Sequence, residues 1–167
     1  MVLRVDGEAF SGFVREVRPL LQRQAFLLCG DWQEAEDLVQ DTLLRVYRAW
    51  WRLVRHEELT GYARTALTRT FLNERRRAQR RYEVASDMVR ENPDPHDELA
   101  VRESRHTLIG ALRRLTAAER AVIVLRYWDD LSVKATAGVL RIPPGTVTSH
   151  SHRAMATLRA VLKEEAS

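Results

Sequence analysis

The residues after Asp31 carry an apolar stripe with the period of an α-helix, and this stripe limits the possible fold more than any other feature. Counted from its first member, the positions fall at offsets of 0, 3, 4, 7, 8, 11, 12 and 15: Ala35, Leu38, Val39, Thr42, Leu43, Val46, Tyr47 and Trp50. A helix buries such a set on one face, whereas a strand spreads it over both faces. Asp31 with Glu34 predicts a capped start of this helix, and Gly30 predicts the end of the helix before it.

Helical spacing recurs on both sides of this stripe. One helix is expected from about Glu8 to Leu28, broken or kinked at Pro19, and another from about Thr60 to Arg81. Their inward-facing residues are Phe10, Phe13, Val14, Val17 and Leu21 in the first, and Ala63, Ala66, Leu67, Thr70 and Phe71 in the second. No segment has a convincing strand pattern or an internal repeat, so the sequence predicts an all-α fold.

An acidic segment with two prolines divides the chain. Residues 82–103 hold 7 acidic and 2 basic side chains, and within them the run Asn92-Pro93-Asp94-Pro95-His96-Asp97 suits neither a regular helix nor a central strand. The sequence therefore predicts two small helical domains, residues 8–83 and 101–163, joined by an acidic, flexible linker at residues 84–100.

Both sides of this segment hold basic blocks in which arginine dominates. Residues 64–81 hold 7 basic and 1 acidic side chains, residues 104–167 hold 10 and 5, and among all 27 basic residues only Lys134 and Lys163 are lysine. The planar guanidinium suits phosphates, carboxylates and base edges, so the bias fits a nucleic-acid or acidic-protein partner. A GC-rich genome explains the bias equally well, so the positions of the arginines matter more than their number.

Several classes of protein are excluded by what the sequence lacks. The single cysteine, Cys29, allows neither an internal disulfide nor a cysteine-based zinc site. His150 and His152 would point about 200° apart on a helix, so they cannot both bind one metal ion. We therefore expect no metal site. No phosphate-binding glycine loop, HExxH motif or nucleophile–base pair is found, so neither enzymatic activity nor a cofactor is expected. With no membrane-span or secretory pattern, a soluble cytoplasmic protein is the expectation.

The C-terminal third has the spacing of a helix-turn-helix. A helix is expected from Leu99 to Leu115, and a capping box of Thr116 and Glu119 then opens the apolar run Ala121–Trp128. The motif itself is expected as a helix from Ser132 to Leu140, a turn from Arg141 to Gly145 and a helix from Thr146 to Leu162. Around the small Ala137, the core between the last two helices is expected to be Val139, Leu140, Ile142 and Val147.

The last of these helices presents hydroxyl, imidazole and guanidinium groups on its outer side, which are Thr146, Thr148, Ser149, His150, His152 and Arg153. Such groups suit the major groove of DNA. A generic helical hairpin with a solvated polar face fits the same pattern, so DNA binding is one of two interpretations.

Aromatic residues accompany the arginines of the N-terminal half. Trp51 and Tyr62 lie near the arginine run of residues 64–81, and the combination suits single-stranded DNA, whose bases stack on aromatic rings. A core of aromatics beside a solvated arginine face is the alternative. Spacing places Tyr47, Trp50 and Phe71 in the core and leaves Trp51 and Tyr62 partially exposed.

Three segments resemble a known family. GDWQEAEDLVQDTL (residues 30–43) resembles region 2 of bacterial RNA polymerase sigma factors, LTAAERAVIVLRYWDDLS (115–132) resembles the start of region 4, and GTVTSHSHRAMATLR (145–159) resembles its recognition helix. The resemblance covers about residues 8–163 and lacks region 3, as in the compact extracytoplasmic-function (ECF, group IV) type. Tyr62-Ala63-Arg64 and Glu74-Arg75-Arg76-Arg77 are similar to the short actinobacterial sigma-E-like branch.

The resemblance implies a role for each domain. Residues 8–83 bind core RNA polymerase and the minus-10 element, and residues 101–163 bind the minus-35 element and the β flap. The residues implied at the clamp helices of the β′ subunit are Asp37, Gln40, Asp41 and Arg45. Those implied at minus-10 DNA are Trp51, His56, Tyr62, Arg64, Arg69, Asn73, Arg76 and Arg77, and those at minus-35 DNA are the six outer residues of the last helix. An anti-sigma factor is a further implied partner.

The chain departs from the family pattern at several positions. Arg69 stands where many relatives have Asn, Ala135 where an acidic residue is usual, Arg141 where Gly is usual, Pro143 where Ser is usual and Thr148 where Lys is common. Pro143 removes the usual N-cap hydroxyl and Thr148 removes a phosphate contact. We therefore expect a weaker or altered minus-35 preference, with the N-terminal domain less affected.

Two other functions are alternatives to a sigma factor. A free-standing helix-turn-helix regulator that binds duplex DNA as a dimer explains the C-terminal domain, but leaves the Asp31–Trp51 helix and the arginine run without a role. An enzyme needs an ordered cluster of titratable groups, which the sequence does not show.

Overall fold

The computed structural model describes residues 7–53, 58–86, 108–165 and 167. The chain divides into two compact units, Met1–Phe71 and Leu72–Ser167. Every regular element of the described residues is a helix, which confirms the predicted all-α fold.

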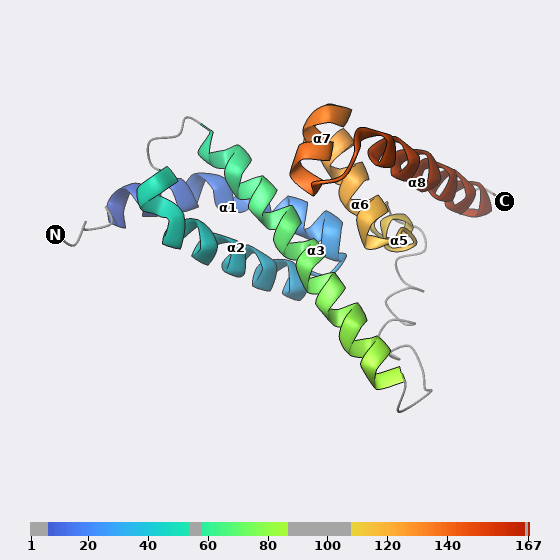
Figure 1. Cartoon of the computed structure of the whole chain (residues 1–167), viewed down its shortest axis with the longest axis horizontal. Helices are drawn as coiled ribbons and strands as arrows, with labels where there is room; N and C mark the ends of the chain where they lie inside the picture. The colour runs from blue at the N-terminus through green and yellow to red at the C-terminus, as the bar shows by residue number, and fades with distance from the viewer. Residues whose placement is uncertain (1–6, 54–57, 87–107, 166) are drawn as a thin grey trace. The chain divides into compact units, whose positions relative to one another are not determined.

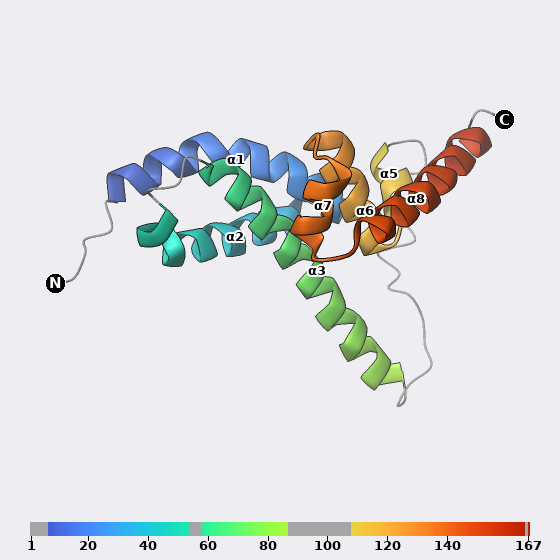
Figure 2. The same ribbon diagram turned by 45° about the horizontal axis from the view of Figure 1, so that its top comes forward.

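Two long helices and the first part of a third build the first unit. α1 (Gly7–Cys29) and α2 (Trp32–Leu53) lie side by side and antiparallel, and α3 (Leu59–Ser86) crosses them (Figures 1 and 2). Gly30 ends α1 at a φ of 71°, and Asp31 Oδ1 accepts a hydrogen bond from the Glu34 amide at 2.9 Å. The predicted end of one helix and start of the next are both confirmed.

α1 continues through Pro19, so the predicted break does not occur. Proline removes one backbone hydrogen bond and crowds the carbonyl four residues earlier. Pro19 lies on the exposed side of α1, where water can solvate that carbonyl, while Val17 and Leu21 on the inner side are 1% and 0% exposed. Burial of this inner side therefore keeps α1 in one piece.

The α2 stripe is buried as predicted, except for Tyr47. Leu38, Val39 and Trp50 are 1%, 0% and 3% exposed, whereas Tyr47 is 43% exposed. Tyr47 stands at the margin of the stripe, and its ring packs edge-on against Phe10 with the centroids 5.0 Å apart. A tyrosine at such a margin buries its ring partly and keeps its hydroxyl near water.

A buried polar contact joins α1 to α3. Gln24 is 0% exposed and donates from Nε2 to Thr68 Oγ1 at 3.0 Å. The inner face of α3 is close to that predicted: Ala63, Leu67, Thr70 and Phe71 are buried and Ala66 is half-buried. α3 continues to Ser86, beyond the predicted end at Arg81, and the predicted linker from residue 87 onward lies outside the described residues.

The described part of the second unit is a set of short helices followed by a long one. In chain order these are α5 (Leu108–Arg113), α6 (Ala117–Ile123), the π-helical turn η1 (Val124–Trp128), α7 (Val133–Leu140) and α8 (Pro144–Glu165). Thr116 and Glu119 form both hydrogen bonds of the predicted capping box, and Ser132 caps α7 as predicted. The π-helical turn was not predicted, because a continuous apolar run does not distinguish a π-turn from an α-turn.

A buried arginine closes the end of α5. Arg120 is 9% exposed and donates to the carbonyls of Leu112 at 2.9 Å and Leu115 at 3.1 Å. The Leu112 carbonyl also accepts from the Leu115 amide at 3.1 Å, and both carbonyls lie at or just beyond the C-terminus of α5, where a positive charge is favourable. Arg120 therefore fixes α5 against α6.

α7 and α8 pack on the predicted small and apolar residues. Ala137, Leu140 and Val147 are 6%, 8% and 0% exposed. Val139 and Ile142, also predicted as core, are only half-buried, because they lie at the margin of the packed faces. The two helices and their tight turn form the predicted helix-turn-helix (Figure 1).

Candidate functional site

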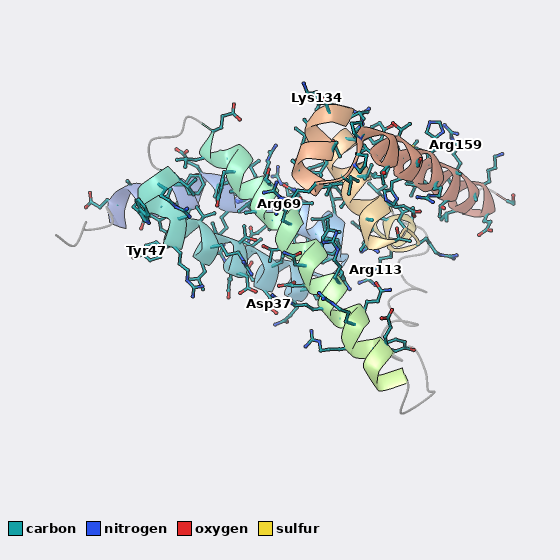
Figure 3. All side chains as sticks on the ribbon, in the orientation of Figure 1. Asp37, Tyr47, Arg69, Arg113, Lys134 and Arg159 are labelled. Atoms are coloured by element: carbon teal, nitrogen blue, oxygen red, sulfur yellow. The ribbon has the colours of Figure 1, made fainter. Side chains whose placement is uncertain are left out.

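The structure brings together the four residues predicted to contact polymerase, on one exposed face of α2. Asp37, Gln40, Asp41 and Arg45 are all exposed, and their spacing places them on the side opposite the buried stripe. Figure 3 labels Asp37 on this helix. Within the same face lies Leu44, which is 48% exposed. We call these five residues the α2 face.

A hydrogen-bonded network from α1 supports the α2 face. Glu36 accepts hydrogen bonds from Gln22 Nε2 at 3.0 Å and from Arg18, with which it also forms an ion pair, and Gln40 Nε2 lies 3.4 Å from its Oε1. The pKa of Glu36 is lowered from its ordinary value, chiefly by the Gln22 hydrogen bond and then, against the opposing effect of desolvation, by the charge of Arg18. Through Glu36, the network links Gln40 of α2 to Arg18 and Gln22 of α1.

Most of the residues predicted to contact minus-10 DNA share one face of α3. Tyr62, Arg69, Asn73, Arg76 and Arg77 follow one another at helical spacing and are exposed, apart from the half-buried Arg69. We call these five residues the α3 stripe, and Figure 3 labels Arg69 within it.

Arg64 does not lie with the α3 stripe. It lies on the side of α3 that faces α1, where its carbonyl oxygen is 3.5 Å from Gln24 Nε2 and its Nε atom is buried. His56, which was predicted to contact the same DNA, lies outside the described residues.

The two neighbouring tryptophans at the end of α2 have different surroundings. Trp50 is buried among rings of α1, with its centroid 5.1 Å from that of Phe10 and 5.3 Å from that of Phe13. Trp51 is 59% exposed, and the guanidinium of Arg52 lies 5.6 Å from its ring centroid. Trp51 therefore offers an accessible ring beside a positive charge, a combination that suits the binding of an unpaired base and its phosphate.

The predicted recognition residues lie on the outer side of α8. Thr148, Ser149, His152 and Arg153 are exposed, and Thr146 and His150 are half-buried. The hydroxyls of Thr148 and Ser149 donate to carbonyls of α8, at 3.2 and 3.0 Å, so their oxygen lone pairs remain available as acceptors.

A backbone conformation suited to glycine marks the turn before α8. Arg141 has φ 56° and ψ 44°, in the left-handed region. The Ile142 amide donates to the Ala137 carbonyl at 3.1 Å, which closes the C-terminus of α7. α8 then begins at Pro144, and the Pro143 carbonyl accepts from the Thr146 amide at 3.0 Å. Proline is well suited to this first helical position.

The described residues contain no group of three or more His, Cys, Asp or Glu side chains that could hold a metal ion. Within the same part of the chain, no helix combines the length and apolar character that crossing a membrane requires.

Sequence reasoning missed two features of these surfaces. Leu44 lies outside the buried stripe, and an apolar residue on the polar side of an amphipathic helix was the signal available for it. For Glu119 the sequence indicates only a capping role, but in the structure its Oε1 also lies 3.7 Å from Arg153 Nε. No spacing rule predicts this second contact, because it depends on how α6 packs against α8.

The sequence matches two protein families in succession, described as Sigma-70 region 2 (residues 13–81) and Sigma-70, region 4 (residues 105–158). It is 34% identical over 153 residues to the RNA polymerase sigma-E factor of Streptomyces coelicolor, covering 92% of this chain and 85% of that protein. It is 36% identical over 155 residues to the ECF RNA polymerase sigma factor SigL of Mycobacterium tuberculosis, covering 87% and 84%.

One similar solved structure is the sigma factor RpoE of Bartonella quintana in complex with the anti-sigma factor NepR. The TM-score is 0.69 at 25% sequence identity, over 93% of this chain and 98% of that one.

Proposed function

This chain belongs to the sigma-70 family as an extracytoplasmic-function sigma factor, and on that premise we propose which of its surfaces bind polymerase and promoter DNA. As a sigma factor, it binds core RNA polymerase and directs promoter recognition and DNA melting for transcription initiation. The observation that carries this function is the succession of the region 2 and region 4 matches along one chain. The matches support domains at residues 8–83 and 101–163 and a linker at residues 84–100.

We propose that the α2 face docks on the clamp helices of the β′ subunit. Asp37 and Asp41 supply negative charge that steers a basic partner, and Gln40 and Arg45 supply hydrogen bonds. Leu44 adds apolar surface in the middle of the face, where contacts contribute most because they are fully desolvated in a complex.

The α3 stripe and Trp51 are proposed to hold the minus-10 element. Exposed guanidinium groups bind backbone phosphates, and exposed rings stack on bases after the strands separate. Stacking favours the unpaired state, so binding energy at this site drives local melting. Arg64 is proposed to support α3 from its inner side.

The outer side of α8 is proposed to read the minus-35 duplex, while the second domain also contacts the β flap. The bond chemistry of transcription belongs to the polymerase, and we propose no enzymatic activity for this chain. Since its partner acts in the cytoplasm, that is its proposed location. An anti-sigma factor, as in the solved relative, is a proposed regulator.

A charge-reversal experiment tests the docking surface. In a pull-down with purified core polymerase, the full-length chain should bind, and Asp37→Arg with Asp41→Arg should weaken binding by at least about tenfold, because like charges then face the partner. The matched control is Glu8→Arg with Glu16→Arg, which reverses two exposed acidic residues of α1 and should bind normally.

Equal binding by both variants would contradict the assigned docking face. A wild-type chain that binds duplex DNA but not polymerase would instead favour the free-standing regulator.

A further inference from the structure

The Arg153 side chain is held from two directions within the second unit. Its Nε lies 3.7 Å from Glu119 Oε1 on α6, and its Nη2 lies 3.2 Å from His150 Nδ1, one turn earlier on α8. The Arg153 side chain is 62% exposed, whereas the Glu119 side chain is only 13% exposed. A sheltered carboxylate therefore faces a guanidinium that remains accessible to a ligand.

The Glu119 carboxylate is itself fixed by the capping box of α6. Its Oε2 accepts a hydrogen bond from the Thr116 amide at 3.2 Å, and Thr116 Oγ1 accepts one from the Glu119 amide at 3.2 Å. Because Oε2 is bound to the backbone, Oε1 is left facing Arg153. The position of one side of the guanidinium is thus set by the backbone at the start of α6.

We propose that Glu119 is a positioning residue for DNA recognition, which aims the Arg153 guanidinium outward from α8. This proposal rests on the proposed function, in which the outer side of α8 reads the minus-35 duplex. Glu119 does not itself touch DNA, and it acts by limiting the directions that Arg153 can take. Nη1 and the outer edge of the guanidinium remain for a base edge or a phosphate.

His150 is oriented by the same arrangement. A guanidinium only donates hydrogen bonds, so His150 Nδ1 must accept from Arg153 and the ring proton of neutral His150 must lie on Nε2. Nε2–H is then a donor directed away from Arg153. The pair therefore offers donor groups, which match acceptors such as guanine N7 and O6, thymine O4 or a phosphate oxygen.

Holding Arg153 in place before DNA binds should improve discrimination between DNA sequences more than it improves affinity for DNA in general. A free arginine loses side-chain freedom on binding and can turn toward any nearby phosphate, whereas a held one meets its target already oriented. The carboxylate also repels the DNA backbone slightly, which lowers binding to unrelated sequences. Removing the charge of Glu119 should therefore reduce the specificity ratio without weakening non-specific binding.

Three variants separate positioning from folding. Glu119→Gln keeps the capping box, since glutamine is also suited to this position, but removes the ion pair with Arg153. Thr116→Ala removes a capping hydrogen bond and leaves the ion pair, and Arg153→Ala removes the side chain that is positioned. Each is assembled as the full chain with core polymerase.

The first probe is a duplex with the minus-35 sequence that the wild-type holoenzyme selects from a randomised library. The second probe is the same duplex with its minus-35 sequence scrambled. The ratio of the two affinities should fall about two- to fivefold in Glu119→Gln, the range for a partly exposed ion pair, while affinity for the scrambled duplex stays or rises. Arg153→Ala should lower the ratio at least as much. Thr116→Ala should lower the melting temperature and leave the ratio unchanged.

A wild-type ratio in Glu119→Gln together with a reduced ratio in Arg153→Ala would overturn the positioning role and leave the proposed function intact. Parallel losses on both duplexes in Glu119→Gln would also overturn it, since they indicate a structural effect. If Arg153→Ala leaves the ratio unchanged, Arg153 does not read this duplex, and both the positioning role and the assigned recognition surface fail.

Discussion

At the residue scale, Glu36 links the acid stability of the first unit to the α2 face. Its pKa is lower in the folded chain than in the unfolded chain, so its stabilisation is full above the unfolded pKa and is lost as the pH falls through the folded pKa. Glu36→Gln should lower the free energy of unfolding by about 0.2–1 kcal/mol at neutral pH, as for a partly exposed ion pair. Denaturant unfolding at a series of pH values should show this deficit shrink as the pH falls through the folded pKa of Glu36. A deficit that stays equal from neutral to acid pH would contradict this origin.

Arg141 is a second residue with a measurable consequence. Its φ of 56° is costly for a residue with a Cβ atom and is readily adopted by glycine. Arg141→Gly should raise the free energy of unfolding by about 0.5–1 kcal/mol, because relief of this strain outweighs the greater freedom of glycine in the unfolded chain. As a control, Arg159→Gly makes the same change at an exposed position inside α8 and should lower the free energy of unfolding by about 1 kcal/mol. Thermal unfolding measures both, and destabilisation by Arg141→Gly would refute the argument.

At the scale of elements, the α3 stripe should govern the salt dependence of minus-10 binding. If Arg76 and Arg77 each bind a phosphate, replacing both with Gln should reduce the slope of log affinity against log salt by about 1.4 on single-stranded DNA. Binding of the holoenzyme to a fork-junction probe at several salt concentrations measures this slope. Arg15→Gln with Arg23→Gln, two exposed arginines on α1, should leave it unchanged. An unchanged slope in the α3 variant would show that these two residues bind no phosphate.

Most of the helices, and the helix ends that carry a capping residue, were predictable because local residues determine them. The α2 stripe, the Asp31 cap, the Thr116–Glu119 capping box and the Ser132 cap depend on side chains within one or two turns of each other. The continuity of α1 through Pro19 and the exposure of Tyr47 depend on packing between helices, which periodicity does not contain.

In the candidate surfaces too, contacts within one helix were predictable from the sequence and contacts between helices were not. The resemblance named every residue of the α2 face except Leu44 and every residue of the α3 stripe, and each set lies together because one helix carries it. The resemblance also grouped Arg64 with the minus-10 residues, whereas Arg64 lies on the side of α3 that packs on α1. The Glu119–Arg153 contact joins two helices far apart in the sequence and could not be predicted without their packing.

At the scale of the whole molecule, two basic blocks on one chain suit binding at two DNA sites. Residues 64–81 carry a net charge of +6 and residues 104–167 a net charge of +5. Held on one polymerase, two weak contacts act at high effective concentration, so together they bind much more tightly than either does alone. Holoenzyme affinity for probes with one promoter element should therefore fall at least about tenfold below that for a probe with both.

The central claim is that this chain confers promoter choice on core polymerase. The most direct measurement is transcription from a randomised template library by core polymerase with and without the chain, followed by sequencing of the RNA 5′ ends. The chain should produce discrete start sites preceded by shared minus-10 and minus-35 blocks, and Asp37→Arg with Asp41→Arg should abolish them. If the chain selects duplexes from the library in the absence of polymerase and adds no start sites to those of core polymerase, the account is wrong.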